Sequence, residues 1–449
     1  MSRPAADLQR VLGVWDLVLL VMGTVIGSGI FLVPGAILQP LGNSITLAAA
    51  VWLTGGVLSL LGALTYGELS AMKPQTGGLY VYIRDCYGPF LAFLFGWTLF
   101  FVISSGSAAT LAVAFSNYLG ELVELTPWGR KLVSVAILGV IGIVNVRGTR
   151  QSANLQNVTT GIKVAGILAM SAALLWFGSH SILPAATLSL SGTGSLASGF
   201  GVAMISVLWA YEGWQYATYS AGEAVNPQRN FPIAFLAGSA ALIVIYLVAN
   251  AGYVAALGAD GVARSNRVAA TALATVINPA VARLVTIVIL ISMFSAANSV
   301  ILTAPRVCFA MARDHLFFKS FAEVHPRFGT PAYAVAGAAG WAAVLAVSGT
   351  FEQLLTYVVF VGWIFYALAA ASVFIYRKRM PHAERPYRVP GYPLTPLAFI
   401  LAAIALVLNT IVSQPGRAAV GLGLALAGAP VYLIWRGRTR AEPAEGGIE

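Results

Sequence analysis

The sequence predicts an all-α protein that spans a membrane about twelve times. Only 9% of its 449 residues are charged and 58% are hydrophobic, whereas a soluble globular protein carries about 25% charged residues. Apolar runs of about 20 residues, long enough to cross the hydrocarbon core of a bilayer, recur along the whole chain. Barrel strands would show alternating patterns of about ten residues instead. Lipid is therefore the expected solvent.

The apolar runs define the expected spans in chain order. They lie near residues 14–38, 45–72, 89–119, 131–147, 153–178, 197–222, 232–257, 280–311, 332–348, 353–376, 393–413 and 417–435. The connections between them are short and polar, so we expect one membrane domain over 14–436, preceded by a segment 1–13 and followed by a tail 437–449.

The basic residues indicate the orientation of the spans. With both termini cytoplasmic, 19 of the 26 lysines and arginines fall on the inner side and 6 on the outer side, with Lys163 inside a span. This asymmetry follows the positive-inside rule, and a nucleic-acid surface would instead gather its charge on one face. We therefore expect a multi-pass protein of the inner membrane, with no nucleic acid as a partner.

The first span is interrupted at Gly27-Ser28-Gly29. A dinucleotide-binding loop would need a strand before it and a helix after it in a soluble βαβ unit, and here both flanks are membrane-length apolar sequence. Two interpretations remain: small residues for close helix packing, or an unwound segment that shows its backbone to a ligand. The second is favoured.

A matching interruption occurs in the sixth span, around Ala210-Tyr211-Glu212-Gly213-Trp214. Five spans separate the two, so they enter the membrane from opposite sides, and paired interruptions of this kind indicate a transporter substrate site between two inverted repeats. The repeats would cover about 14–178 and 197–376, with the last two spans added at 393–435. A helix start offers N–H groups to a carboxylate and the opposing carbonyl end can receive an ammonium group, which together suit an α-amino acid.

Three charged residues within predicted spans are singled out. Glu212, near the centre of the sixth, is interpreted as a contact for substrate or a proton carrier, or else as a structural partner of a neighbouring helix. Lys163 in the fifth span could extend to the interface or be held inside the bundle in place of a bound cation. Glu68, near the inner end of the second span, is expected to pair with a basic loop.

No catalytic constellation is apparent. The four histidines lie in or near predicted loops without metal-ligand spacing, and Cys86 and Cys308 are interpreted as small buried hydrophobic residues. We therefore expect no enzymatic activity and no cofactor.

Three motifs resemble a known superfamily. The run GTVIGSGIF from Gly23 to Phe31 resembles the first-span signature of the amino acid–polyamine–organocation superfamily. The stretch YGELSAMKPQTGGLYVY from Tyr66 to Tyr82 resembles its second span and loop, and WAYEGWQYATYSAGEAVNPQRNFP from Trp209 to Pro232 resembles the sixth span of its L-type amino acid transporter group. The resemblance implies a LeuT-like fold of 5+5 inverted repeats with broken helices 1 and 6, working by alternating access.

The same resemblance implies the site residues. Those expected to bind the substrate are Thr24, Ile26, Gly27, Ser28, Gly29, Trp209, Ala210, Glu212 and Gly213. Trp209 would act as an aromatic gate, alone or with Tyr211 and Trp214. Lys163 matches a lysine that stands where sodium-coupled relatives bind an ion, which favours exchange or proton coupling over sodium symport.

Two departures from the resemblance affect function. L-type light chains carry a cysteine after the third span that bonds to a heavy chain, and the loop Gly120 to Lys131 has none, so no disulfide-linked partner is expected and a prokaryotic member is indicated. Neutral-substrate members have a small residue where Glu212 stands. The sequence thus predicts a sodium-independent L-amino acid exchanger or proton symporter. A cationic amino acid or polyamine transporter, a transport-inactive sensor of the same fold and an ion channel are the alternatives.

Overall fold

The structure, a computed structural model, describes residues 8–120, 122–182, 196–265, 267–349, 351–413 and 415–441. Within those ranges it is helical, with one isolated β-bridge between Leu12 and Ala224. The expected all-α class is confirmed.

Nine of the described segments are long and apolar enough to cross a membrane. They are Val14–Leu32, Ile45–Met72, Pro89–Leu119, Pro127–Val146, Thr149–Phe177, Pro227–Ala263, Arg283–Arg313, Leu394–Val412 and Ala418–Trp435. Ala332–Ser348 is apolar but shorter. The remaining two expected spans correspond to the broken sixth helix and to Phe351–Arg379, part of whose side chains lie outside the described set. Twelve spans therefore stay a prediction.

The helices of the first half follow the expected runs closely. They are α1 Val14–Val25, α2 Gly29–Leu32, α3 Pro34–Leu38, α4 Ile45–Met72, α5 Leu79–Tyr87, α6 Pro89–Thr98, α7 Ser105–Leu119, α8 Pro127–Val146 and α9 Thr149–Phe177. A π-helical segment, Leu99–Ser104, joins α6 to α7. Helix α5, which is not an apolar run, was not expected from the sequence.

The second half adds more short helices. They are α10 Leu196–Ala210, α11 Pro227–Ala263, α12 Val268–Val276, α13 Pro279–Thr303, α14 Pro305–Arg313, α15 Ala332–Ser348, α16 Phe351–Arg379, α17 Leu394–Ser413, α18 Pro415–Leu426 and α19 Gly428–Ala441, together with the 3₁₀ helix η3 Trp214–Glu223. Pro305 divides the predicted eighth span into α13 and α14, because proline lacks an N–H and favours the first turn of a new helix.

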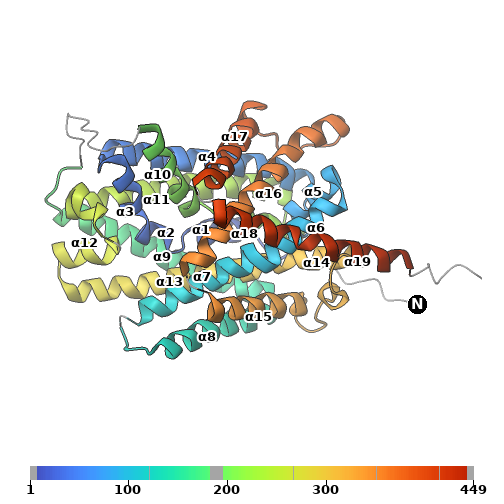
Figure 1. The fold of residues 1–449 in the computed structure, drawn as a ribbon, viewed down its shortest axis with the longest axis horizontal. Helices are drawn as coiled ribbons and strands as arrows, with labels where there is room; N and C mark the ends of the chain where they lie inside the picture. The colour runs from blue at the N-terminus through green and yellow to red at the C-terminus, as the bar shows by residue number, and fades with distance from the viewer. Residues whose placement is uncertain are drawn as a thin grey trace, which may run out of the picture.

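The first broken helix lies inside the bundle. Helix α1 packs against α9, α11, α13 and η3, and Figure 1 shows it between α4 and α11 on one side and α7, α8 and α15 on the other. Residues of α7, α9, α10 and α13 lie against the glycines around the first break. Irregular backbone at membrane depth is stable only where protein or a water-filled cavity surrounds it.

The two breaks lie close to their predicted positions. Helix α1 ends at Val25, residues 26–28 are non-helical, and Gly29 already begins α2, so the first break starts one residue early. Helix α10 ends at Ala210, and Gly213 has φ +126°, a conformation that glycine adopts far more readily than other residues. The break in the sixth apolar run lies between Ala210 and Trp214, as predicted, and the segment after it is the 3₁₀ helix η3.

The start of the first broken span is joined to the end of the second by one parallel β-bridge between Leu12 and Ala224. The N–H groups of Val11 and Leu12, just before α1, donate to the carbonyl oxygen of Glu223 at 2.9 Å, and the N–H of Val225 donates to Leu12 at 2.8 Å. The start of the first broken span therefore lies beside the end of the second.

Candidate functional site

A cavity lies between the two breaks. Its lining residues come from α1 and α2, from α7, from α10 and η3, and from α13: Thr24, Val25, Gly27, Ser28, Gly29, Ser107, Thr110, Leu111, Trp209, Ala210, Glu212, Gly213, Tyr216, Ala296 and Val300. Every residue predicted to bind substrate lines this cavity except Ile26. The two interruptions, almost two hundred residues apart in the sequence, thus form one site.

The two breaks pack against each other's helices. Gly29 of the first break lies against the end of α10, and Gly213 of the second break lies against the end of α1. A Cβ atom placed on Gly29 would lie 3.1 Å from the backbone and side chain of Ala210. A Cβ atom on Gly213 would lie 3.0 Å from the backbone of Thr24. Glycine therefore permits the close approach of the two breaks. The sequence offered close packing and ligand binding as two alternative roles for these glycines. In the structure, glycines that pack closely also line the cavity.

The hydroxyl group of Tyr246 on α11 joins the same two helix ends. It lies 3.2 Å from the carbonyl oxygen of Val25 and 3.1 Å from that of Ala210. A hydroxyl proton serves one acceptor at a time, so the contact alternates between them or is shared. This tyrosine, inside an apolar run, had no signal in the sequence that distinguished it from a packing residue.

Polar groups of the first break remain available to a ligand. The hydroxyls of Ser28 and Thr110 are buried and have no hydrogen-bond partner in the described part of the chain. The N–H groups of Ser28, Gly29 and Ile30 likewise have no protein acceptor there, as the first turn of a helix requires. Because unpaired buried polar groups cost free energy, a ligand with acceptor atoms would stabilise this arrangement.

Glu212 lies at the opposite side of the cavity. Its Oε1 accepts a hydrogen bond from the hydroxyl of Tyr366 on α16 at 2.9 Å, and no basic side chain within the described ranges forms an ion pair with it. A carboxylate in such a site needs a proton or a cation. Both interpretations of Glu212 from the sequence remain open, since it contacts a neighbouring helix and also lines the cavity.

Lys163 lies behind the first break. Its ammonium group donates hydrogen bonds to the carbonyl oxygens of Gly23 and Ile26, both at 2.6 Å, and the side chain has no exposed surface. Ser292 on α13 donates to Ile26 and Gly27 at 3.1 and 2.9 Å. The lysine therefore does not extend to the membrane interface but holds the carbonyl end of α1.

The sequence interpretation missed the part of the cavity lining that lies outside the two breaks. Ser107, Thr110 and Leu111 on α7, Tyr216 on η3, and Ala296 and Val300 on α13 all line it. The cluster Ser104-Ser105-Gly106-Ser107 in the third apolar run was an available signal. It follows the π-helical segment Leu99–Ser104, and π-helical turns occur frequently at functional sites.

A buried ion pair lies beyond the end of η3. Arg306 donates to both carboxylate oxygens of Glu223, at 2.7 and 3.1 Å, and to Thr149 at 2.9 Å. Neither Arg306 nor Glu223 is more than 1% exposed. Since Glu223 also binds the N-terminal segment through its carbonyl oxygen, this contact holds α9, α14, η3 and the start of α1 together.

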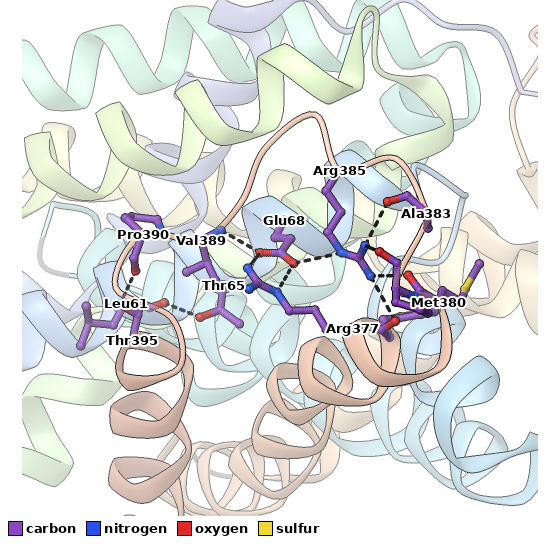
Figure 2. A network of polar contacts seen from close by, with 12 residues as sticks. Leu61, Thr65, Glu68, Arg377, Met380, Ala383, Arg385, Val389, Pro390 and Thr395 are labelled. Carbon is purple, nitrogen blue, oxygen red and sulfur yellow. Dashed lines mark hydrogen bonds and ion pairs between the residues drawn. The ribbon is translucent and has the colours of Figure 1, made fainter.

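A second charged network fastens the loop after α16, as Figure 2 shows. Glu68 on α4 accepts two hydrogen bonds from Arg377, at 2.9 and 2.7 Å, and one from the N–H of Val389 at 2.7 Å. The Nε atom of Arg385 lies 3.7 Å from Oε1 of Glu68, and its guanidinium donates to carbonyl groups at the end of α16 and just after it. The expected structural pairing of Glu68 with a basic loop is confirmed.

The described residues hold no cluster of three or more potential metal ligands. Cys86 and Cys308 are buried free thiols, and burial raises the pKa of the Cys86 thiol above its ordinary value. Both fit the predicted role of small hydrophobic residues.

Comparison with known proteins gives a consistent result. The family model described as amino acid permease matches residues 12–434. The serine/threonine exchanger SteT of Bacillus subtilis is 32% identical over 431 residues, 95% of this chain and 96% of that protein. The b(0,+)-type amino acid transporter 1 of Homo sapiens is 31% identical over 91% of this chain and 84% of its own length. The human cystine/glutamate transporter is 28% identical over 94% and 85%.

Proposed function

This chain belongs to the amino acid permease family, and from that premise we propose that it exchanges L-amino acids across the cell membrane without sodium. The cavity between the two breaks carries the proposal. It brings together the free hydroxyl of Ser28, the helix start at Gly29 and the ends of α1 and α10. The helix start suits an α-carboxylate, and the carbonyl ends of α1 and α10 in the same cavity suit an α-ammonium group.

The proposed transport cycle is alternating access in a LeuT-like arrangement of twelve spans with both termini cytoplasmic. The contact of Leu12, at the start of the first broken span, with Glu223 and Val225, at the end of the second, and the reciprocal packing of the breaks support the inverted repeat. The intervening cavity would then open to one side of the membrane at a time.

Sodium independence rests on Lys163. Its side-chain nitrogen already donates to two carbonyl oxygens at the break, so those oxygens are not free to coordinate a sodium ion. A bound cation would also have to displace those hydrogen bonds. The proposal does not include a covalently attached subunit, because both cysteines are buried within the bundle.

A second candidate concerns the substrate side chain. Glu212 faces the cavity with a hydroxyl as its one described polar partner. A lysine or arginine substrate would supply the opposite charge, and such a pair is stronger in a site shielded from water. We propose that the pocket accepts cationic side chains, with proton carriage by Glu212 as the alternative that the same experiment separates.

The test is counterflow in proteoliposomes. Vesicles loaded with one unlabelled amino acid at a time are placed in medium with a trace of labelled alanine, leucine, serine or arginine, with sodium replaced by potassium. An exchanger accumulates label only when the lumen holds a transported amino acid. Uptake without internal substrate but driven by a pH gradient would favour proton symport, and the absence of any flux would favour the sensor interpretation.

A further inference from the structure

A groove runs along the outer face of the bundle between α8 and α15, which lie side by side at its edge (Figure 1). It is separate from the substrate cavity. Its lining is almost entirely apolar until one end, where a charged residue and an aromatic residue occur: Val135, Gly139, Gly142, Ile143, Val146, Arg147, Phe328, Ala336, Ala339, Gly340 and Ala343.

Glycines create the hollow. A Cβ atom placed on Gly139 or Gly340 would meet no atom within 4 Å, so both positions border open space. At Gly142 the helices touch instead, since a Cβ atom there would lie 3.1 Å from Ala339. The groove therefore has a closed floor at the helix contact and an open side between the two outer glycines.

The surroundings of the groove are typical of a lipid-facing surface. Val140, Ile143 and Val344 expose 49%, 57% and 53% of their surface, and α8 is one of the membrane-spanning candidates. Side chains of this kind are stable at such exposure where acyl chains surround them. Whatever fills the groove between them is apolar along most of its length.

The charged end of the groove has unpaired positive charge. Arg147, the C-cap of α8, is exposed, and its guanidinium forms neither an ion pair nor a side-chain hydrogen bond within the part of the chain that the structure describes. The guanidinium of Arg327 lies 5.5 Å from the ring of Phe328, a lining residue, and it too has no ion pair among the described residues. No carboxylate lines this end of the groove.

The loop that carries Phe328 is held in place. The Nδ1 atom of His325 accepts hydrogen bonds from the N–H groups of Arg327 and Phe328, at 3.2 and 3.3 Å. Thr330 donates to the carbonyl oxygen of Val146 at 2.7 Å, which fastens the loop to the end of α8. The charged end is thus formed before any ligand arrives.

We propose that this groove binds one phospholipid with a net anionic headgroup, its phosphate on Arg147 and one acyl chain along Gly139 and Gly340. The two unpaired guanidinium groups at one end and the apolar walls beyond them match a headgroup and its chain. A partner helix would leave both arginines without a counter-charge. Helices α8 and α15 both pack on α7, and α7 supplies Ser107 and Thr110 to the substrate cavity. A lipid bound between α8 and α15 would therefore stabilise the two helices that support α7.

The test is native mass spectrometry of the purified, delipidated full chain titrated with phosphatidylglycerol or phosphatidylcholine of identical acyl chains. We expect the first phosphatidylglycerol to bind more tightly than the first phosphatidylcholine. Arg147→Gln should weaken that first binding step about fivefold, the contribution of one basic residue near an anionic headgroup. Arg147→Lys should retain most of it. Gly139→Leu and Gly340→Leu, which fill open space without a clash, should weaken both lipids.

Matched controls come from the same chain. Arg264 is likewise an exposed C-cap arginine, at the end of α11, and Gly423 on α18 likewise borders open space, so Arg264→Gln and Gly423→Leu should leave the first binding step unchanged. Equal affinity of both lipids for the unaltered chain, or equal effects of Arg147→Gln and Arg264→Gln, would overturn the proposal. So would a dimer whose mass peak is lost in Gly340→Leu, since a second copy would then occupy the groove. None of these outcomes depends on transport activity.

Discussion

The ammonium group of Lys163 donates a 2.6 Å hydrogen bond to the carbonyl oxygen of Ile26, the first residue beyond α1. Ser292 also donates to this carbonyl, at 3.1 Å, so two side chains satisfy the oxygen that the unwound segment leaves without a helical partner. In the proposed function, this contact occupies a carbonyl oxygen that a bound cation would otherwise need as a ligand. The contact explains why Ile26, predicted to face the substrate, instead turns its carbonyl group toward α9.

The first prediction concerns ions. Exchange by the unaltered protein should proceed at the same rate in sodium, potassium or choline medium at fixed pH. Lys163→Ala should reduce exchange strongly and lower the melting temperature, because two buried carbonyl groups each lose a partner at about 1–3 kcal/mol. Lys131→Ala, at an exposed position on α8, is the control and should change neither. A strict sodium requirement of the unaltered protein would contradict the role given to Lys163.

The second prediction concerns side-chain selectivity. Glu212→Gln keeps the shape of the side chain but removes its charge, so it should weaken arginine and lysine binding by roughly ten- to a hundredfold, corresponding to a charged hydrogen bond of about 1.5–3 kcal/mol. Alanine and leucine should change little. The KM values for exchange in proteoliposomes measure this, with Glu384→Gln in the exposed loop as the control. An unchanged substrate profile of Glu212→Gln, with a lost pH dependence, would instead assign proton carriage.

The third prediction concerns Glu68. Its carboxylate is 2% exposed and pairs with Arg377, and removing one member of a buried pair typically costs about 3–5 kcal/mol. Glu68→Gln should therefore lower the melting temperature in detergent, while Asp260→Asn, at an exposed hydrogen bond to Asn43, should shift stability by less than about 0.5 kcal/mol. The double variant Glu68→Gln with Arg377→Gln should lose less than the two single losses combined. Strict additivity would show that the pair is not coupled.

The sequence predicted the broken helices well because their cause is local. Glycine and serine in the middle of an apolar run are poor helix formers there and expose backbone, so Gly27-Ser28-Gly29 and Glu212-Gly213 could be located within a residue or two. The wall formed by Ser107 and Thr110 had a weaker signal, the serine cluster before it, because small polar residues equally serve close packing of membrane helices.

Contacts between segments far apart in the sequence could not be predicted, for a different reason. Tyr246 and Tyr366 are ordinary aromatic residues of apolar runs, and their hydroxyls meet Ala210 and Glu212 only through the packing of α11 and α16 on the second break. Lys163 was recognisable as unusual from its charge alone. Whether it faced the interface or the break depended on the rotation of α9, whose polar and apolar residues do not separate onto two clear faces.

The last prediction separates the two glycines at the breaks. Gly213 has φ +126°, and its Cβ position lies 3.0 Å from the backbone of Thr24, which cannot move aside as a side chain can. Gly213→Ala should therefore incur backbone strain of about 1–3 kcal/mol in addition to the clash, and lose both stability and exchange. Gly29 has no positive φ, and its Cβ position lies 3.1 Å from Ala210, so Gly29→Ala should remain folded.

The measurements are melting temperature and counterflow rate, with Gly161→Ala as the control because no atom lies within 4 Å of its Cβ position. In Gly29→Ala the helix start must move away from α10, so the rate should fall more than the stability. Equal effects of all three alanines would mean that the breaks do not need their close approach. A folded Gly29→Ala with impaired exchange would instead show that the distance between the two breaks is a property of the substrate site itself.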